Sequence, residues 1–317
     1  MKKDASMSLS HLMKMKFPQA RGIIGGGVLN AGGNLILAGE GGIGKSLMTL
    51  ELSLRLIKGE PFIGLPVARV GGVLFLQSEN PPSEIKERTN RMLKGLKYSK
   101  APKEIYFSRP GLQYNLGKKG DTDKIISEVQ RTKAEVLIID PFIDFHTEDE
   151  NENTPMRRIL KRLNRIKHKA HVAVILVHHF SKAADRKGQY RLRGASTIFD
   201  WADTVIELSG KGHGNERTVK FLKTKFGKRR EDIHLLRDQN FIHQVVEEKS
   251  KCTTKDVVTV LKKKFSGACD KKGQLVNALT KKTNCSESTA SKAIRKALKE
   301  GKIREERKGK KKSVKLV

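Results

Sequence analysis

The chain is poor in cysteine, aromatic residues, acidic residues and long apolar runs. Its 317 residues include three cysteines, one tryptophan and 5% aromatic residues. Cys252, Cys269 and Cys285 are odd in number and lack C-x-x-C spacing, which argues against a disulfide framework or a zinc site and favours a reducing cytoplasm. The longest apolar runs, such as Val172–Val177, are too short to span a bilayer. The basic segment Met1–Phe17 lacks the apolar core of a signal peptide, so we expect a soluble cytoplasmic protein without a membrane partner.

The scarcity of acidic residues leaves a large positive charge. The chain has 65 Lys and Arg residues against 34 Asp and Glu residues, for a net charge of +31. Such a charge attracts polyanions, with nucleic acid as the leading candidate and an anionic membrane surface as the second. The charge is uneven, because residues 251–317 hold 21 basic and six acidic residues and so carry about half of the excess.

The pattern along the chain indicates two domains. A polar stretch near Glu247–Lys251 separates two patterned regions. We expect a P-loop domain over 1–246, with 1–20 as an N-terminal extension, a linker at 247–252 and a second domain over 253–317. Short apolar strands alternate with helices in the first region, which predicts an α/β fold with a mostly parallel sheet covered by helices on both faces. The expected strands are Asn34–Ala38, Val73–Leu76, Val136–Ile139, Val172–Val177, Thr204–Leu208, Val219–Lys223 and Ile233–Leu236, and the expected helices are Lys45–Lys58, Ser83–Leu96 and Pro155–His168.

The second region predicts three helices followed by two short strands. The helices are expected at Thr254–Phe265, Lys272–Lys282 and Ser286–Glu300, and the strands lie within Lys302–Val317 around a basic turn. This is the pattern of a winged helix-turn-helix domain. The third helix has cations opposite its apolar residues, so it is expected to enter a DNA major groove while the basic turn touches phosphates. The expected contacts are Ser291, Lys292, Arg295, Lys296, Lys299, Lys310 and Lys311. A small protein-binding winged helix is the alternative.

A phosphate-binding loop follows the first strand of this pattern. Gly39–Ser46 reads G-x-x-x-x-G-K-S, between an expected strand and an expected helix. Its glycines allow backbone N–H groups to surround phosphate oxygens, and the helix N-terminus adds its dipole. Lys45 is expected to reach the β- and γ-phosphates of ATP, and Ser46 to bind Mg²⁺. The expected nucleotide contacts are Gly39, Glu40, Gly41, Gly42, Ile43, Gly44, Lys45, Ser46 and Leu47.

Two acidic residues end other strands of the same expected sheet. Asp140 closes the apolar strand Val136–Ile139, as a Walker B residue that holds Mg²⁺ through water. Pro141 follows it in place of a glutamate, so the catalytic base must come from elsewhere. Glu79 follows the strand Val73–Leu76 and is interpreted as the base that deprotonates the attacking water.

Further polar segments follow the later strands. His179, in the pair His178–His179, is expected to sense the γ-phosphate or the activated water. The cations of the Ser181–Arg193 segment suit a nucleic-acid backbone, and Lys223 and Lys225 are candidates for a finger that reaches a neighbouring subunit's nucleotide. The acidic run Glu148–Glu150 is interpreted as a solvated loop. The expected nucleic-acid contacts of the basic segment are Lys182, Arg186, Lys187, Arg191 and Arg193.

Taken together, these motifs resemble RecA-type P-loop ATPases, in particular the RepA-like hexameric helicase group of plasmids and mobile elements (AAA_25-like). The resemblance covers roughly Gly22–Asp238. It rests on Gly32–Gly39 before the P-loop, Leu74–Glu79, Asp140-Pro141 with Asp149–Asn151 and Met156–Arg158, His178–Phe180, Arg193–Ser196 through Trp201–Asp203, and Lys223–Gly227. The last of these is similar to the K-x-R-x-G finger of DnaB-like and RadA-like proteins, with Lys225 where an arginine is common.

The resemblance implies a RecA-like fold, ATP hydrolysis with Mg²⁺ at the subunit interfaces of a ring, usually a hexamer, and a single DNA strand in its channel. The implied role is that of a replicative helicase or replication-initiation ATPase of a mobile element, with replication proteins as further partners. Three alternatives remain open from the residues. These are an ATP-switched duplex-binding regulator, a RadA-like recombination or repair ATPase, and a chaperone-like ATPase loader.

Overall fold

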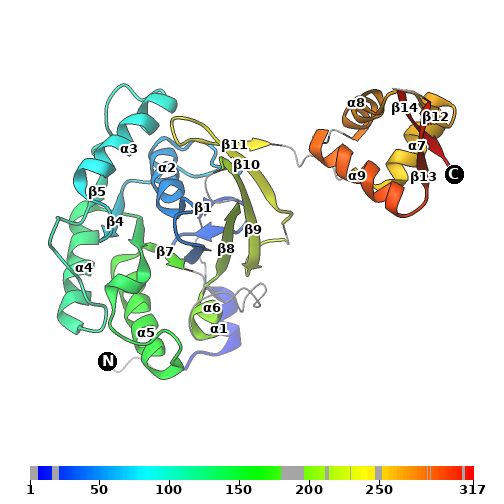
Figure 1. Cartoon of the computed structure of the whole chain (residues 1–317). Coiled ribbons are helices and arrows are strands. Elements are labelled where there is room, and N and C mark those ends of the chain that lie inside the picture. Colours follow the sequence, from blue (N-terminus) through cyan, green and yellow to red (C-terminus); the bar gives the residue numbers. More distant parts are fainter. Residues whose placement is uncertain are drawn as a thin grey trace. The chain divides into compact units, whose positions relative to one another are not determined.

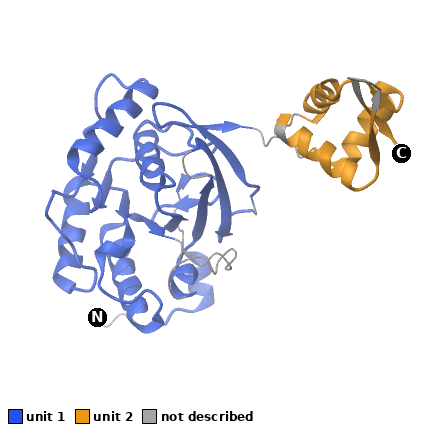
Figure 2. Cartoon of the chain, viewed as in Figure 1, with its two compact units in different colours: residues 1–246 blue, residues 247–317 orange. Residues whose placement is uncertain are grey.

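The chain divides into two compact units, Met1–Val246 and Glu247–Val317 (Figure 2). The structure is a computed structural model and describes residues 6–15, 21–179, 196–210, 214–228, 230–246, 252–283, 285, 287–308 and 311–317. Within these residues, no helix combines the length and the apolar character needed to cross a membrane.

The first unit is built on a sheet that has nine strands in its described residues (Figure 1). Their order across the sheet is β11-β10-β9-β8-β3-β7-β6-β4-β5. The strands from β8 to β5 in this order run parallel, and β9, β10 and β11 extend the sheet in antiparallel fashion. The strands are β3 (Asn34–Gly39), β4 (Val73–Gln77), β5 (Ile105–Phe107), β6 (Val136–Asp140), β7 (Ala173–His179), β8 (Thr204–Gly210), β9 (Glu216–Thr224), β10 (Ile233–Arg237) and β11 (His243–Val246).

Helices cover both faces of this sheet, which confirms the predicted α/β class. One apolar core joins the sheet to α4 (Lys119–Thr132), α5 (Asn153–Ala170) and the short α6 (Ser196–Trp201). A second core joins the other face to α2 (Lys45–Lys58) and to the hairpin of β1 (Gly22–Ile24) and β2 (Leu29–Asn30). Successive residues of each strand alternate between the two cores. Helix α3 (Pro82–Gly95) packs beside α2, η1 (Phe142–Phe145) follows β6, and α1 (Leu9–Lys14) precedes β1.

Helix α2 has the predicted bounds because its sequence marks both ends. Gly44 and Gly59 flank it, with left-handed φ values of 101° and 73° that favour glycine. Arg55 and Lys58 in the last turn complement the helix dipole. Its apolar side chains contact the sheet on one side and α3 on another, and this burial fixes the orientation of the loop at its N-terminus.

The second unit has three helices and three antiparallel strands among its described residues. The helices are α7 (Thr254–Phe265), α8 (Lys272–Thr283) and α9 (Glu287–Lys299), and the strands, in the order β12-β14-β13, are β12 (Ala268–Cys269), β14 (Lys311–Leu316) and β13 (Ile303–Lys308). A capping box between Thr253 and Asp256 starts α7. A separate apolar core, which includes Leu261, Leu275 and Ile294, holds the helices together. The unit therefore has the core that an independent domain requires.

Candidate functional site

The glycine-rich loop lies between the end of β3 and the start of α2, at the carboxyl edge of the parallel strands. Gly42 and Gly44 adopt φ values of 72° and 101°, which L-residues with side chains rarely take. A Cβ at Gly39 would lie 2.5 Å from the carbonyl oxygen of Leu208, so only glycine fits where the loop leaves the sheet. The loop therefore has the backbone geometry of a phosphate cradle at a helix N-terminus.

Lys45 bends back over this loop. Its side-chain nitrogen donates to the carbonyl oxygens of Gly39 at 3.0 Å and Glu40 at 2.8 Å, and the residue is only 5% exposed. Burial lowers the pKa of Lys45 to about 8, although the charges of Asp140, Glu79 and Glu40 act in the opposite direction. A buried ammonium that donates to neutral carbonyl oxygens is well suited to exchange them for phosphate oxygens.

Ser46 and Asp140 come together beside Lys45. Asp140 ends β6 and is 4% exposed, and the Ser46 hydroxyl hydrogen-bonds to its carboxylate. Burial raises the pKa of Asp140 to about 6; the Ser46 hydrogen bond lowers it, and the charge of Glu79 raises it further. Oxygen donors of this kind are those that Mg²⁺ prefers, and a cation would restore the ionised carboxylate. The pair therefore fits a magnesium ion.

Glu79 and His179 complete the cluster predicted from the strand ends. Glu79 follows β4 and its side chain is 51% exposed. Nε2 of His179 lies 3.9 Å from Oε1 of Glu79, and Nδ1 of His179 lies 3.4 Å from Nζ of Lys45. The structure thus brings Lys45, His179 and Glu79 together from the ends of β3, β7 and β4, with Asp140 at the end of β6, the strand between β7 and β4.

The turn that carries Glu79 is held by residues that we did not anticipate. The Gln77 side chain donates to the Asn80 carbonyl oxygen at 2.9 Å and accepts from the Asn80 N–H at 3.1 Å. Arg88 of α3 donates to Oδ1 of Asn80 at 2.9 Å. On the other side, the hydroxyl of Ser78 donates to Asp144 of η1 at 2.5 Å. These hydrogen bonds fix the chain on both sides of Glu79. The sequence signal for such a turn was the run of polar residues Gln77–Asn80 directly after an apolar strand.

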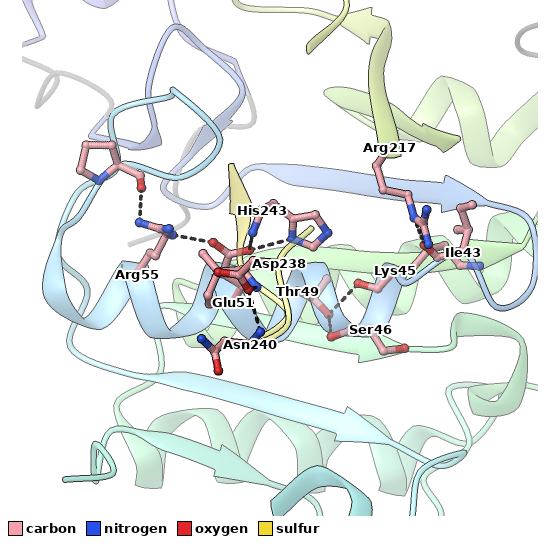
Figure 3. A network of polar contacts seen from close by, with 12 residues as sticks. Ile43, Lys45, Ser46, Thr49, Glu51, Arg55, Arg217, Asp238, Asn240 and His243 are labelled. Atoms are coloured by element: carbon pink, nitrogen blue, oxygen red, sulfur yellow. Dashed lines mark hydrogen bonds and ion pairs between the residues drawn. The ribbon is translucent and has the colours of Figure 1, made fainter. Parts of the chain in front are cut away.

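Two arginines from the antiparallel extension also contact the loop, and sequence reasoning missed both. Arg217 of β9, 2% exposed, donates from Nε to the carbonyl oxygen of Ile43 at 2.7 Å (Figure 3). Nη1 of Arg237, at the end of β10, would lie 3.1 Å from a Cβ at Gly44. Burial lowers the pKa of each guanidinium, and the charge of Arg237 lowers that of Arg217 further. The loop is therefore lined by two more cations than its own motif contains.

Helix α2 is tied to the last strand of the sheet by a buried carboxylate. Glu51 is 0% exposed and accepts from the backbone N–H of His243 at 3.0 Å and from Nε of Arg55 at 2.8 Å (Figure 3). The same carboxylate lies 2.7 Å from Nδ1 of His243. Asp238 shapes the adjoining turn by accepting from the N–H groups of Asn240 and Ile242. This network holds α2, and with it the P-loop, against β11.

Removing the Glu51 carboxylate should therefore destabilise the first unit. We expect Glu51→Ala to lower the free energy of unfolding by about 3 kcal/mol, because buried His243 and Arg55 lose their charged partner. Glu60→Ala is the matched control, since Glu60 forms a surface pair with Lys58 that contributes at most about 1 kcal/mol. Urea denaturation measures both changes, and equal effects of the two substitutions would contradict the role of Glu51.

The two finger candidates, Lys223 near the end of β9 and Lys225 just after it, differ in their surroundings. Lys223 donates to the carbonyl oxygens of Phe199 and Asp200 in α6 at 3.0 and 2.9 Å, and burial lowers its pKa. Lys225 is 59% exposed and lies 3.6 Å from Asp203. Lys225 is thus the cation available to another molecule, whereas Lys223 is engaged within its own unit.

The predicted nucleic-acid contacts divide between described and undescribed residues. Lys182, Arg186, Lys187, Arg191, Arg193 and Lys310 lie outside the described residues, as does the side chain of Lys311. On α9, the four cations are exposed while Ile294 is buried and Ser291 is half-buried. These exposed cations are Lys292, Arg295, Lys296 and Lys299.

The interpretation of Glu148–Glu150 as a solvated loop is wrong for its last residue. Glu150 is 6% exposed and faces His146 and His178. No group of three or more His, Cys, Asp or Glu side chains in the described residues has the geometry to hold a metal ion. Cys252, Cys269 and Cys285 of the second unit are free thiols.

Proteins similar to this chain include DNA repair proteins named RadA. It is 23% identical over 219 residues to the DNA repair protein RadA of Streptococcus pneumoniae, which covers 68% of this chain and 44% of that protein. It is also 24% identical over 230 residues to RadA of Mycobacterium tuberculosis, in a match that covers 71% of this chain and 42% of that protein. The chain thus spans less than half the length of these relatives.

A family model confirms the interpretation of the P-loop region. The model of the AAA_25 family, described as an AAA domain, matches residues 4–185, which is more than half of the chain and includes the loop, Glu79, Asp140 and His179. The matched segment carries the parallel strands β3 to β7 and the glycine-rich loop described above. The chain therefore belongs to the AAA_25 family and is a P-loop ATPase of the RecA type.

Proposed function

We propose that this protein hydrolyses ATP in response to DNA and acts as a ring-forming helicase or replication-initiation ATPase of a plasmid, phage or other mobile element. The observation that carries the proposal is the convergence of Lys45, Asp140, Glu79 and His179 at one edge of the sheet of a protein with a net charge of +31. The convergence of these side chains supports ATP chemistry, and the positive net charge supports a polyanionic partner.

In the proposed reaction, the loop and Lys45 bind the phosphates of ATP. Lys45 exchanges the carbonyl oxygens of Gly39 and Glu40 for β- and γ-phosphate oxygens. Mg²⁺, when bound at Ser46 and Asp140, would offset phosphate charge. Arg237, whose Nη1 would lie 3.1 Å from a Cβ at Gly44, is proposed as a further contact to the bound nucleotide.

Glu79 then acts as the general base. It accepts a proton from water as the water oxygen attacks the γ-phosphorus, and the bond from phosphorus to the ADP oxygen breaks. His179, 3.9 Å from Glu79 and 3.4 Å from Lys45, is positioned to contact the γ-phosphate or the attacking water. Activation of water by Glu79, contact of His179 with the γ-phosphate and binding of phosphate by Lys45 would thus take place within one cluster of side chains.

The second unit is proposed to be a winged-helix domain that binds duplex DNA. Its helices α7, α8 and α9 and its antiparallel strands have the order of that motif. The exposed cations of α9 project away from the buried face that includes Ile294, as a recognition helix requires. The hairpin of β13 and β14 would supply the wing, with Ser291 of α9 at the edge of the DNA contact.

The ring is proposed to place ATP between subunits. Lys225 is the exposed cation of the Lys223–Gly227 segment and would approach the nucleotide of a neighbouring subunit after leaving Asp203. Lys223 would instead support this segment through α6. A single DNA strand in the channel would contact the basic segment that contains Lys182, Arg186, Lys187, Arg191 and Arg193.

The similarity to RadA favours a second candidate, a recombination or repair ATPase. The two roles share the same ATP site and differ in what hydrolysis drives. Unwinding of a forked duplex supports the helicase, whereas strand-exchange activity without unwinding supports the RadA-like role.

The first test is the steady-state ATPase rate without DNA, with single strands and with duplex. We expect single strands to raise the rate about tenfold or more, because loading on a strand orders the ring interfaces that complete the site. The salt concentration must be fixed near 150 mM, since a +31 protein binds any polyanion at low ionic strength. Heparin at equal charge is the matched control for non-specific polyanion binding. A slow rate that single strands do not change, with tight duplex binding, would favour an ATP-switched regulator instead.

A further inference from the structure

A buried polar cluster lies behind the ATP site, on the opposite face of the sheet from the P-loop helix. Glu150, in the segment between η1 and α5, places Oε1 3.5 Å from Nδ1 of His178 and 3.6 Å from Nε2 of His146. The three residues are 6%, 1% and 6% exposed, respectively. The ring of Phe142 packs against both histidines, with centroid distances of 4.6 Å to His146 and 6.1 Å to His178.

The burial of Glu150 is costly and calls for a role. In the acidic run, Asp149 is exposed and Glu148 is partly exposed, and in the described part of the chain no lysine or arginine pairs with Glu150. An isolated carboxylate in an apolar core is strongly unfavourable unless polar partners compensate for the lost water. Here the partners are two imidazoles, one from the segment that follows Asp140 and one from β7. The cluster therefore joins this segment to β7.

The cluster contacts β7 at His178, the residue directly before His179. Along β7, Val174 and Leu176 enter the core with α5, whereas Ile175 and Val177 enter the core with α2. Because strand side chains alternate, His178 continues the first series and His179 the second. His178 thus faces Glu150 at 3.5 Å on one face of the sheet, while His179 lies 3.4 Å from Lys45 and 3.9 Å from Glu79 on the other.

We propose that Glu150 is a positioning residue for ATP hydrolysis, which holds His178 and thereby sets the orientation of His179 toward the γ-phosphate and Glu79. This rests on the proposed function, since it assigns a task to Glu150 only if the site hydrolyses ATP. The segment that carries Glu150 also contacts the turn of the proposed base. Asp144 in this segment accepts the hydrogen bond from Ser78, the residue before Glu79. A ligand that moves this segment would therefore shift Glu79 and His179 together.

The test is Glu150→Gln, which keeps the size of the side chain and removes its charge. We expect kcat to fall about 10- to 100-fold, the loss that a misplaced reacting group produces, while the Kd for a fluorescent non-hydrolysable ATP analogue changes less than about twofold. Glu148→Gln is the matched control, because Glu148 lies two residues away and only approaches Arg158, at 4.0 Å. This control should keep the wild-type kcat and Kd.

Combination with His179→Ala separates positioning from general destabilisation. If Glu150 acts through His179, Glu150→Gln should lower kcat little further in the His179→Ala background. Equal fold-losses in both backgrounds would overturn the proposal, as would an unchanged kcat for Glu150→Gln. If Glu150→Gln does not fold, His178→Gln in both backgrounds decides by the same criterion. A wild-type protein without ATPase activity would instead refute the proposed function, and normal turnover by His179→Ala would refute the role of His179.

Discussion

Lys45→Ala should reduce ATP turnover by about 100- to 1,000-fold, the loss expected when a preorganised charge at the transferring phosphoryl group is removed. The site contains no ready substitute. Among the described residues near the loop, Arg217 is committed to the carbonyl oxygen of Ile43, and Arg237 lies beside Gly44 at the start of α2. Steady-state phosphate release measures the loss.

The conformation of Lys45 gives this prediction a second part. Because Lys45 occupies the carbonyl oxygens of Gly39 and Glu40, its removal leaves these acceptors without their donor and also removes a charge that ATP would meet. ATP affinity should therefore fall along with kcat. Lys161→Ala, on the exposed side of α5, is the matched control and should leave both unchanged. Turnover by Lys45→Ala at the wild-type rate would remove the basis for the proposed phosphate site.

Local patterns were sufficient to predict the elements that carry the site. Helix α2 has the predicted bounds because glycines flank it and its apolar spacing has a clear helical period. Strands β4, β6 and β7 differ from their predicted bounds by one or two residues at most, because each is an apolar run followed by a polar residue. Since parallel strands end at the same edge, their terminal residues could be brought together without coordinates.

Features that depend on distant partners could not be predicted in this way. The direction of β9, β10 and β11 depends on which strands they pair with, and the pattern of each strand is the same in either direction. The tie between Lys223 and α6 needs the carbonyl oxygens of Phe199 and Asp200, which no pattern at Lys223 reveals. Neither the strand directions nor the contact of Lys223 with α6 could therefore be predicted from the local sequence.

Glu150 illustrates the same limit at the level of a single residue. Three consecutive acidic residues normally indicate a solvated loop, and Glu148 and Asp149 are partly or fully exposed. Glu150 is buried because His146 and His178, 4 and 28 residues away, offer it polar partners within an apolar core. The His178–His179 pair was recognised as polar, and strand alternation places its members on opposite faces, but which face carries the P-loop helix depends on how β7 packs in the sheet.

Glu79→Gln should abolish hydrolysis while ATP binding is retained. A general base contributes about 10²- to 10⁴-fold, and the amide of glutamine cannot accept the proton from the attacking water. The substitution preserves the shape of the turn, because Gln77, Asn80 and Arg88 hold it without the Glu79 side chain. The half-exposed position of Glu79 also means that its change of charge leaves the fold intact.

Binding and hydrolysis must be measured separately to test this assignment. We expect the Kd for ATP to stay within about threefold of the wild type or to tighten, because removal of the Glu79 charge reduces repulsion of the triphosphate and of Asp140. Single-turnover hydrolysis should fall by at least 100-fold in the same protein. Glu87→Gln, an exposed position on α3, is the matched control. If Glu79→Gln hydrolyses ATP normally while Lys45→Ala does not, the phosphate site stands and the base is another group. A joint loss of binding and hydrolysis would instead show that Glu79 shapes the nucleotide site rather than activating water.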